Sequence, residues 1–187
     1  MSISSPTPRW PKEIPVGSNG LGVKLCLSHI NERSSIVKFY NNNLVKHLFH
    51  DGQLLALLVS GRFSEPGIHF FTQNDYSQQL AYMRHPSGKV IAPHVHNPVP
   101  RSVEFTQEVL LIKKGKLRVD FYTPTREYIG SWIIESGDVL LLATGGHGFE
   151  ILEEIEMIEV KQGPYAGDKD KTRFAVIPRD QVKLLEG

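Results

Sequence analysis

Two histidines one residue apart, His94 and His96, lie between prolines in the stretch VIAPHVHNPVPR, residues 90–101. In an extended strand alternate side chains project from the same face, so both imidazoles would point one way and Val95 the other. Two imidazoles at this spacing can bind one ion at nitrogen–metal distances of about 2.1 Å. The flanking prolines stiffen the backbone and lower the entropy lost in holding the pair. On its own, such a doublet is equally typical of a solvated surface turn.

Two further polar residues stand at the ends of apolar segments. Glu108 begins the segment EVLLIKKGKLRVDFY, where a buried carboxylate is costly unless it is paired or bound to a cation. His147 follows the apolar run VLLLA within a glycine-rich turn, and glycines permit backbone angles closed to other residues. Cys26 is the only cysteine, which excludes an internal disulfide and a thiolate cluster. A metal site in this chain would therefore use nitrogen and oxygen ligands.

The elements that must position these residues read as strands. From residue 67 onward, apolar runs of four to eight residues recur between clusters of Gly, Pro, Asn and Asp, including KVIAPHVH at residues 89–96. In KLRVDFY the alternation is strict and places Leu117, Val119 and Phe121 on one face. Gly115 and Gly137 are expected at tight connections between strands. Many short strands without a helical period predict an all-β barrel or sandwich.

The N-terminal third is less regular. Residues 1–20 are rich in Pro, Ser and Gly and are expected to form a flexible arm, followed by an extension over residues 21–66 that packs on a domain formed by residues 67–187. Within the extension, residues 31–49 are compatible with a short helix, and residues 52–63, GQLLALLVSGRF, predict a buried strand.

The composition is that of an ordinary globular domain. Of the 187 residues, 40% are hydrophobic and 22% charged, which suits one domain with a substantial core. The formal net charge of +1, without a dense run of Lys and Arg, argues against a nucleic-acid partner and favours a small neutral or anionic ligand. The longest apolar runs are strand-sized, and prolines interrupt the start of the chain. We therefore expect no membrane partner, no signal peptide and a cytoplasmic location.

Taken together, these features resemble the two signature motifs of the cupin superfamily. The resemblance covers about residues 67–163 and comprises the His94-x-His96 doublet, Glu108 with six residues before Gly115, and Gly137 with Gly145 and His147. It implies a double-stranded β-helix, a jelly-roll barrel carrying an N-terminal extension. It also implies a divalent transition metal, such as Fe, Mn, Ni, Cu or Zn, bound by His94, His96, Glu108 and His147.

The chain departs from the family pattern at two points. Eleven residues separate His96 from Glu108, where the family has three or four. In the second motif, Ala143 stands where the family has Pro, and the family's histidine falls one position later than His147. The longer segment contains Glu104, an alternative carboxylate ligand. We favour Glu108 because its spacing to Gly115 and its apolar strand match the family pattern.

The function implied is a metal-dependent enzyme, a dioxygenase or an isomerase, acting on a small polar substrate such as a sugar derivative or an organic acid. The alternatives are a non-catalytic sugar-binding protein and a metal-free nucleotide-sugar isomerase or epimerase. Cupin barrels commonly pair, so a homodimer is expected. Candidate residues for substrate contact or proton transfer are Tyr82, Arg101 and Glu150, with Gln79 and Lys161 as weaker candidates. Packing or surface roles are expected for the other histidines, which are His29, His47, His50, His69 and His85.

Overall fold

The computed structural model describes residues 25–26, 35–164 and 167–185, and these residues form an all-β protein. This confirms the all-β part of the predicted fold class. The only helical segments described are two short 3-10 turns, η1 (Gly167–Asp170) and η2 (Arg179–Gln181). No helix in the described ranges has the length and apolar character needed to cross a bilayer. The strands are β1 (Leu25–Cys26), β2 (Ser35–Tyr40), β3 (Val45–His50), β4 (Gln53–Val59), β5 (Gly67–Phe70), β6 (Ala81–Arg84), β7 (Glu108–Tyr122), β8 (Tyr128–Glu135), β9 (Val139–Leu142) and β10 (Gly146–Lys161).

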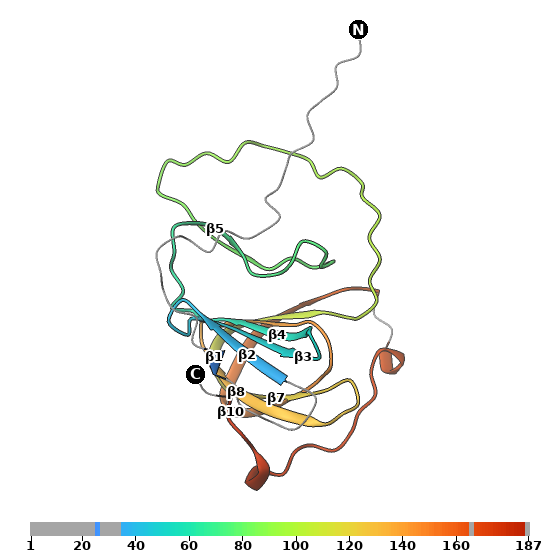
Figure 1. Cartoon of the computed structure of the whole chain (residues 1–187). Coiled ribbons are helices and arrows are strands. Elements are labelled where there is room, and N and C mark those ends of the chain that lie inside the picture. The colour runs from blue at the N-terminus through green and yellow to red at the C-terminus, as the bar shows by residue number, and fades with distance from the viewer. Residues whose placement is uncertain (1–24, 27–34, 165–166, 186–187) are drawn as a thin grey trace.

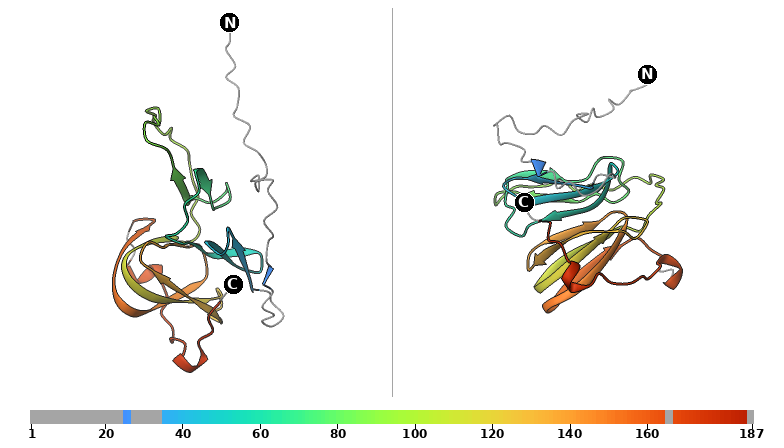
Figure 2. Two further views of the ribbon diagram at one scale, coloured as in Figure 1. Left: turned by 90° about the vertical axis from the view of Figure 1, so that its left-hand side faces the viewer. Right: turned by 60° about the horizontal axis from the view of Figure 1, so that its bottom comes forward.

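Most strands belong to one antiparallel sheet in the order β1-β2-β3-β4-β9-β7-β10, with β8 added beside β7 (Figure 1). Strand β4 pairs with β9, so the strands of the N-terminal region are hydrogen-bonded into the same sheet as the rest of the molecule. β7 and β10 are long and curve together through an arc (Figure 2). Sheet β5-β6 is separate and contains only those two strands.

The prediction of a short helix within residues 31–49 is wrong for residues 35–49, the part that the structure describes. β2 and β3 form an antiparallel hairpin there, and Ser35 lies opposite His50 at its open end. The connection contains Asn41, Asn42 and Asn43, whose φ angles of 50°, 54° and 67° lie in the left-handed region. Asparagine tolerates this region better than other non-glycine residues, so three in succession favour a turn over a continuing helix. The strand predicted within residues 52–63 is confirmed as β4.

The tight connection expected at Gly115 is also wrong, because β7 continues through this residue. On one edge, the first half of β7 pairs with β9 and its second half pairs with β8, while β10 follows the other edge. Gly115 has a φ of +86°, and β10 shifts register opposite it. The glycine therefore bends one long strand. The turn expected at Gly137 is confirmed, with a φ of +91° between β8 and β9.

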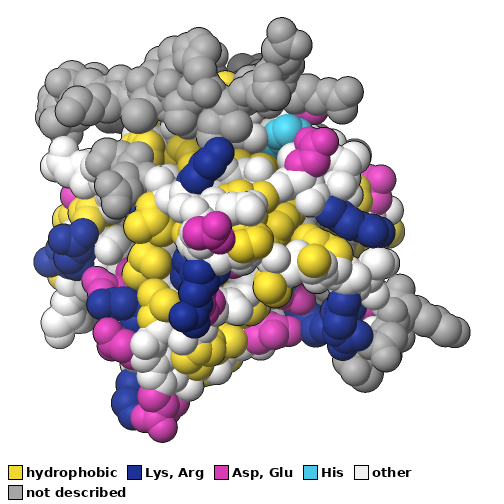
Figure 3. Space-filling model, turned by 90° about the horizontal axis from the view of Figure 1, so that it is seen from below, with side chains coloured by type: hydrophobic (Ala, Val, Ile, Leu, Met, Phe, Trp, Pro, Cys, Tyr) yellow, Lys and Arg dark blue, Asp and Glu magenta, His cyan; other side chains and the backbone are white. Residues whose placement is uncertain are grey.

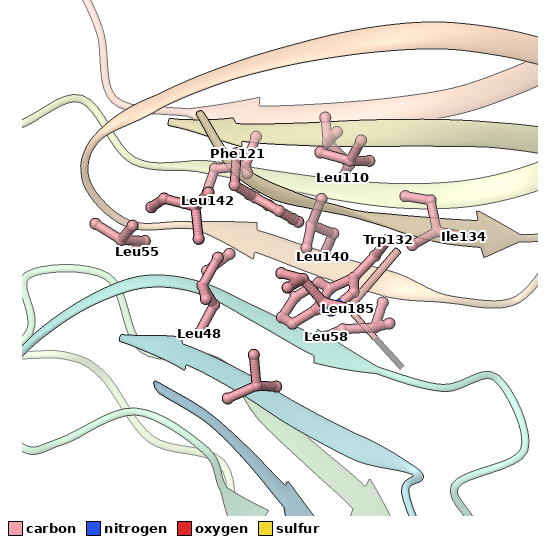
Figure 4. Close-up of a cluster of buried hydrophobic side chains, with 14 of the residues drawn as sticks. Leu48, Leu55, Leu58, Leu110, Phe121, Trp132, Ile134, Leu140, Leu142 and Leu185 are labelled. Atoms are coloured by element: carbon pink, nitrogen blue, oxygen red, sulfur yellow. The ribbon is translucent and has the colours of Figure 1, made fainter. Parts of the chain in front are cut away.

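The sheet is apolar on both faces. One cluster, the inner core, contains Leu117, Val119 and Phe121 together with Leu140 and Trp132, all at most 1% exposed (Figure 4). This confirms the face predicted from the alternation in KLRVDFY. The second cluster lies on the opposite face of β4 and β9. It is formed by Val45, Leu54, Leu57, Val59, Phe63, Leu141 and Ala143, and side chains from the β5–β6 region pack against it.

Charged side chains outside these clusters alternate in sign. Lys113, Lys114 and Lys116 of β7 form ion pairs with glutamates of β8 and β10. Seen from below, the molecule shows Lys and Arg beside Asp and Glu, with apolar side chains between them (Figure 3). This face therefore carries no stripe of a single charge.

The strand expected at residues 89–96 does not form. Residues 85–107 have no strand and arch away from the main sheet (Figures 1 and 2). Pro86 and Pro93 lack the N–H that a ladder requires, and no neighbouring strand is present to pair with them. Among the described strands β10 pairs only with β7, and no closed barrel is found among them.

Candidate functional site

The structure brings Glu108 and His147 into contact. Glu108 is the first residue of β7 and lies opposite Leu142, the last residue of β9. The chain then turns and returns as β10, of which His147 is the second residue. The Nε2 atom of His147 is 3.2 Å from Oε2 of Glu108, and the two side chains are 29% and 16% exposed. The contact therefore follows from a short connection between two strand ends.

Lys161, the last residue of β10, adds a cation to this pair. It lies opposite Glu108 in the β7–β10 ladder, with its Nζ atom 3.8 Å from Oε1 of Glu108 and 3.0 Å from Oε1 of Glu159. The hydrogen bond from His147 holds the pKa of Glu108 below its usual value, against the effect of burial, and the positive charges of His147 and Lys161 act in the same direction. The carboxylate is therefore charged at neutral pH.

Sequence reasoning kept Lys161 only as a weaker candidate for substrate contact and favoured a solvated surface charge, whereas the structure places it beside Glu108. The signal that would have identified it is the register of β10 against β7. That register depends on a pairing between residues far apart in the chain, which a local pattern does not contain.

The histidine doublet lies elsewhere. His94 and His96 are next to each other, with ring centroids 5.2 Å apart, and the ring of His94 hydrogen-bonds through Nδ1 to the carbonyl oxygen of Ala92 at 3.0 Å. Every residue from 86 to 106 is exposed. In the described part of the chain, no three His, Cys, Asp or Glu side chains are grouped so that they could hold a metal ion. Within a single chain, Glu108 and His147 are therefore in contact, whereas His94 and His96 are not grouped with them.

The remaining candidates occupy three different environments. Tyr82 of β6 packs edge-to-face on Phe63, with ring centroids 4.9 Å apart, as part of the second apolar cluster. Arg101 is exposed and donates a hydrogen bond from Nη1 to the carbonyl oxygen of Val99 at 3.3 Å. Glu104, the alternative carboxylate, is exposed in the same segment. Neither Arg101 nor Tyr82 forms a hydrogen bond or an ion pair with Glu108 or His147.

Glu150 is held by two guanidinium groups. It lies opposite Arg118 in the β7–β10 ladder and forms ion pairs with Arg118 and Arg179. Arg118 also donates two hydrogen bonds to the carboxylate of Asp120, and Ser131 donates a third at 2.6 Å. Asp120 is 4% exposed, so this network is mostly buried. Such fully paired networks typically stabilise one arrangement of the strands.

Two hydrogen bonds fasten the C-terminal end of the exposed segment. Thr106 donates a hydrogen bond to Oδ1 of Asp170 at 2.9 Å, and the backbone N–H of Gln107 donates to Oε1 of Gln162 at 2.6 Å. Gln79 bonds to Thr72 and to the backbone of Gln73 and Tyr76, which fixes the loop between β5 and β6. Gln79 therefore has a structural role in this loop.

The Glu108–His147 pair has the chemistry of half a metal site. Carboxylate oxygen and imidazole nitrogen both suit divalent transition metals, and their separation of 3.2 Å allows both to reach one ion. Two protein donors leave several coordination positions for other ligands. The donors present therefore fit a metal as two of its ligands.

The comparisons with known proteins give no further guide to this site. No family model matches the chain, no curated protein matches it, and no solved structure matches it.

Proposed function

We propose that this chain binds a divalent transition metal through Glu108 and His147 together with His94 and His96, within a jelly-roll barrel. We further propose that it is an enzyme, a dioxygenase or an isomerase, for a small polar substrate such as an organic acid or a sugar derivative. The observation that carries the proposal is the Glu108–His147 contact at the ends of β7, β9 and β10, with Lys161 beside it.

The chemistry of the substrate follows from the charges around this pair. A bound divalent metal would polarise an oxygen atom of the substrate. The side chain of Lys161 is 26% exposed and its ammonium group lies next to the pair, so it would bind a carboxylate or a phosphate of the same substrate. Glu159 at 3.0 Å holds this ammonium in place. The site therefore favours an anionic substrate over a neutral one.

Metal binding is the first test. Protein purified without a histidine tag, stripped with chelator and titrated with Mn²⁺, Ni²⁺ or Zn²⁺, should bind about one ion per chain. The variants His147→Ala and Glu108→Gln should each weaken this binding roughly 100-fold or more, beyond the effect typical of residues that only support a ligand. The measurement is isothermal titration calorimetry combined with elemental analysis.

A matched control is available in the same chain. His50 and Asp51 form another histidine–carboxylate pair, with Nε2 and Oδ2 3.5 Å apart, on the β3–β4 connection. The variant His50→Ala should bind metal as tightly as the unmodified protein. Equal loss in His50→Ala and His147→Ala, or unchanged affinity in His147→Ala, would exclude the proposed site.

A metal-free isomerase or epimerase is the second candidate, and the same contact supports it. A histidine oriented by a carboxylate is the usual arrangement of a general base. In this case His147 would remove a proton from the substrate and Glu108 would fix its tautomer. A protein that neither carries nor binds metal, yet catalyses exchange of a sugar proton with deuterated solvent in a manner abolished by His147→Ala, would establish this candidate.

A further inference from the structure

The outer edge of β10 is a free strand edge beside the candidate site. Among the described strands, β10 pairs only with β7, although it extends from Gly146 to Lys161. Next to His147, it exposes Phe149 (39%), Ile151 (50%) and Leu152 (44%). Proteins usually protect long edge strands with charge, proline or a covering segment, because unpaired N–H and C=O groups bind other strands. Most of β10 carries such charges, but between residues 149 and 152 the one carboxylate, Glu150, is already paired with Arg118 and Arg179. This apolar part of the edge is therefore where an additional strand would fit.

The segment between β6 and β7 has a sequence that favours an extended backbone, but within its own chain it packs on no surface. Val90 is 79% exposed, Val95 is 86% exposed and Ile91 is 60% exposed. Ala92, Asn97 and Val99 each precede a proline, which biases them toward extended conformations. So many exposed apolar side chains on a pre-extended segment indicate a binding partner.

The prolines also fit a strand that pairs along one edge only. In an extended strand, Val90, Ala92, His94 and His96 direct their backbone N–H and C=O groups to one edge, while Pro93 and Val95 direct theirs to the other. Pro93 therefore removes an N–H only from the outward edge, where a strand tolerates it. The edge of the two histidine residues keeps all of its backbone donors.

Both ends of this segment are fixed on their own chain. At one end, Phe63 is 3% exposed and packs edge-to-face on Phe71 and Tyr82, which anchors the β5–β6 hairpin on the second apolar cluster. At the other end, Thr106 and Gln107 bond to Asp170 and Gln162. With both ends anchored, the middle of the segment stands clear of its own sheet (Figures 1 and 2).

The β5–β6 hairpin, which precedes the segment, also has an apolar side that is not covered. Ile68, Phe70 and Met83 project from the β5–β6 sheet and are 52%, 48% and 55% exposed. A two-stranded sheet is marginally stable in water by itself and gains stability by packing its apolar side on another surface. The hairpin and the segment therefore need the same additional surface.

From these observations we propose that residues 90–96 of a second copy of this chain pair along the free edge of β10 at residues 146–152, so that His94 and His96 of one chain meet Glu108 and His147 of its partner. The inference rests on the proposed function for the role of the four residues, and on the exposed edge and segment for the pairing. If each chain places its residues 90–96 on β10 of the other, the result is a closed two-fold dimer in which both β10 edges are covered. Main-chain hydrogen bonds of this kind are a common mode of strand recognition.

The oligomeric state tests the pairing without reference to a metal. The unmodified chain should have twice the monomer mass by light scattering at micromolar concentration. Val90→Asp should shift the protein to monomer by at least 10-fold in dissociation constant, because it places a charge on the histidine-bearing face of the segment. Val90 is 79% exposed in one chain, so this substitution leaves the fold of the monomer intact. Ile151→Asp should have the same effect from the β10 side.

Val176→Asp is the matched control. Val176 is 82% exposed and lies on neither β10 nor residues 86–106. This variant should remain a dimer. A monomeric unmodified protein, or a dimer that Val90→Asp and Ile151→Asp leave unchanged, would overturn the proposal.

A mixed dimer tests whether the site is shared between chains. One variant, His94→Ala/His96→Ala, lacks the doublet, and the other, Glu108→Gln/His147→Ala, lacks the pair. Each should bind no metal alone. Co-expressed with two different non-histidine tags and purified through both, the mixed dimer should bind one ion per two chains, because one complete site remains.

The outcomes of this experiment are distinct. A mixed dimer without metal, when the unmodified dimer binds two ions, would show that each chain builds its own site and would overturn the inference. If the unmodified protein binds no metal, the proposed function fails, and the Val90→Asp and Val176→Asp comparison alone decides whether the segment exchange is correct.

Discussion

His47 is a partly buried histidine whose Nε2 atom is enclosed without a hydrogen-bond partner. It lies between the rings of Tyr40 and Phe49, with centroids 5.0 and 5.9 Å away. Burial, and secondarily the charge of Lys38 opposite it in β2, lowers the pKa of His47 from 6.5 to about 4. The imidazole is therefore neutral in the folded protein over most of the physiological range, which agrees with the packing role expected from the sequence.

This residue makes stability depend on pH in a defined window. The pKa of His47 is lower in the folded state than in the unfolded state, so the unfolded chain takes up the proton first as the pH falls. Stability is then complete above about pH 6.5 and decreases toward pH 4 by on the order of 2–3 kcal/mol. His47→Phe should remove most of this decrease, and Lys38→Gln should reduce it slightly. Urea denaturation at several pH values measures both, and an unchanged slope in His47→Phe would contradict the explanation.

At the level of elements, the bend of β7 at Gly115 allows one strand to pair with β9, β8 and β10. A Cβ atom at this position would lie 1.9 Å from the backbone oxygen of Glu154 in β10. Such an approach requires the backbone of one strand to move. The glycine therefore fixes where the two halves of β7 diverge, and with them the position of Glu108 relative to β10.

Gly115→Ala should accordingly destabilise the protein by about 3 kcal/mol or more, because backbone strain and a main-chain clash add together. Gly52→Ala is the matched control, since Gly52 also has a positive φ, +78°, but has no atom within 4 Å of the added Cβ. It should cost only about 1 kcal/mol, the usual penalty of the left-handed region. Chemical denaturation of both variants measures the difference, and equal losses would show that the contact with Glu154 is unimportant.

Local sequence patterns predicted where strands form better than they predicted which strands pair with each other. The alternation of Leu117, Val119 and Phe121 identified a core face because the period of a strand is a local property. The turn formed by three successive asparagines within residues 31–49 was not predicted, because short apolar runs do not distinguish a helix from a hairpin. Lys161 was not recognised beside Glu108, and the doublet was expected as a strand, because both depend on pairing with distant residues.

At the level of the whole molecule, β4 contributes to both apolar clusters. Leu58 belongs to the inner core and Leu57 to the second cluster, and β4 pairs with β9 through four residues of each strand, from Val59↔Val139 to Ala56↔Leu142. The sequence suggested that residues 21–66 pack on a domain formed by residues 67–187. The observed pairing instead makes the described part of this region a structural member of the main sheet.

A fragment of residues 67–187 should therefore fail to fold. Without β4, the apolar edge and faces of β9 would be exposed, including Leu141, which is fully buried in the whole chain. The fragment should bind a hydrophobic dye and unfold without cooperativity, and addition of a fragment of residues 1–66 should restore a cooperative transition. A sharp transition in the fragment of residues 67–187 alone would contradict this view.

Glu108 opens β7 and Lys161 closes β10, so both side chains project from the last pairs of their ladder. Exchange of either residue for another leaves every backbone hydrogen bond of the two strands in place. Natural variation can therefore alter the charge presented at this end of the sheet without disturbing the interior. Under the proposed function, a substitution at Lys161 would change which substrate charge the site accepts, whereas Glu108 would have to stay to bind the metal.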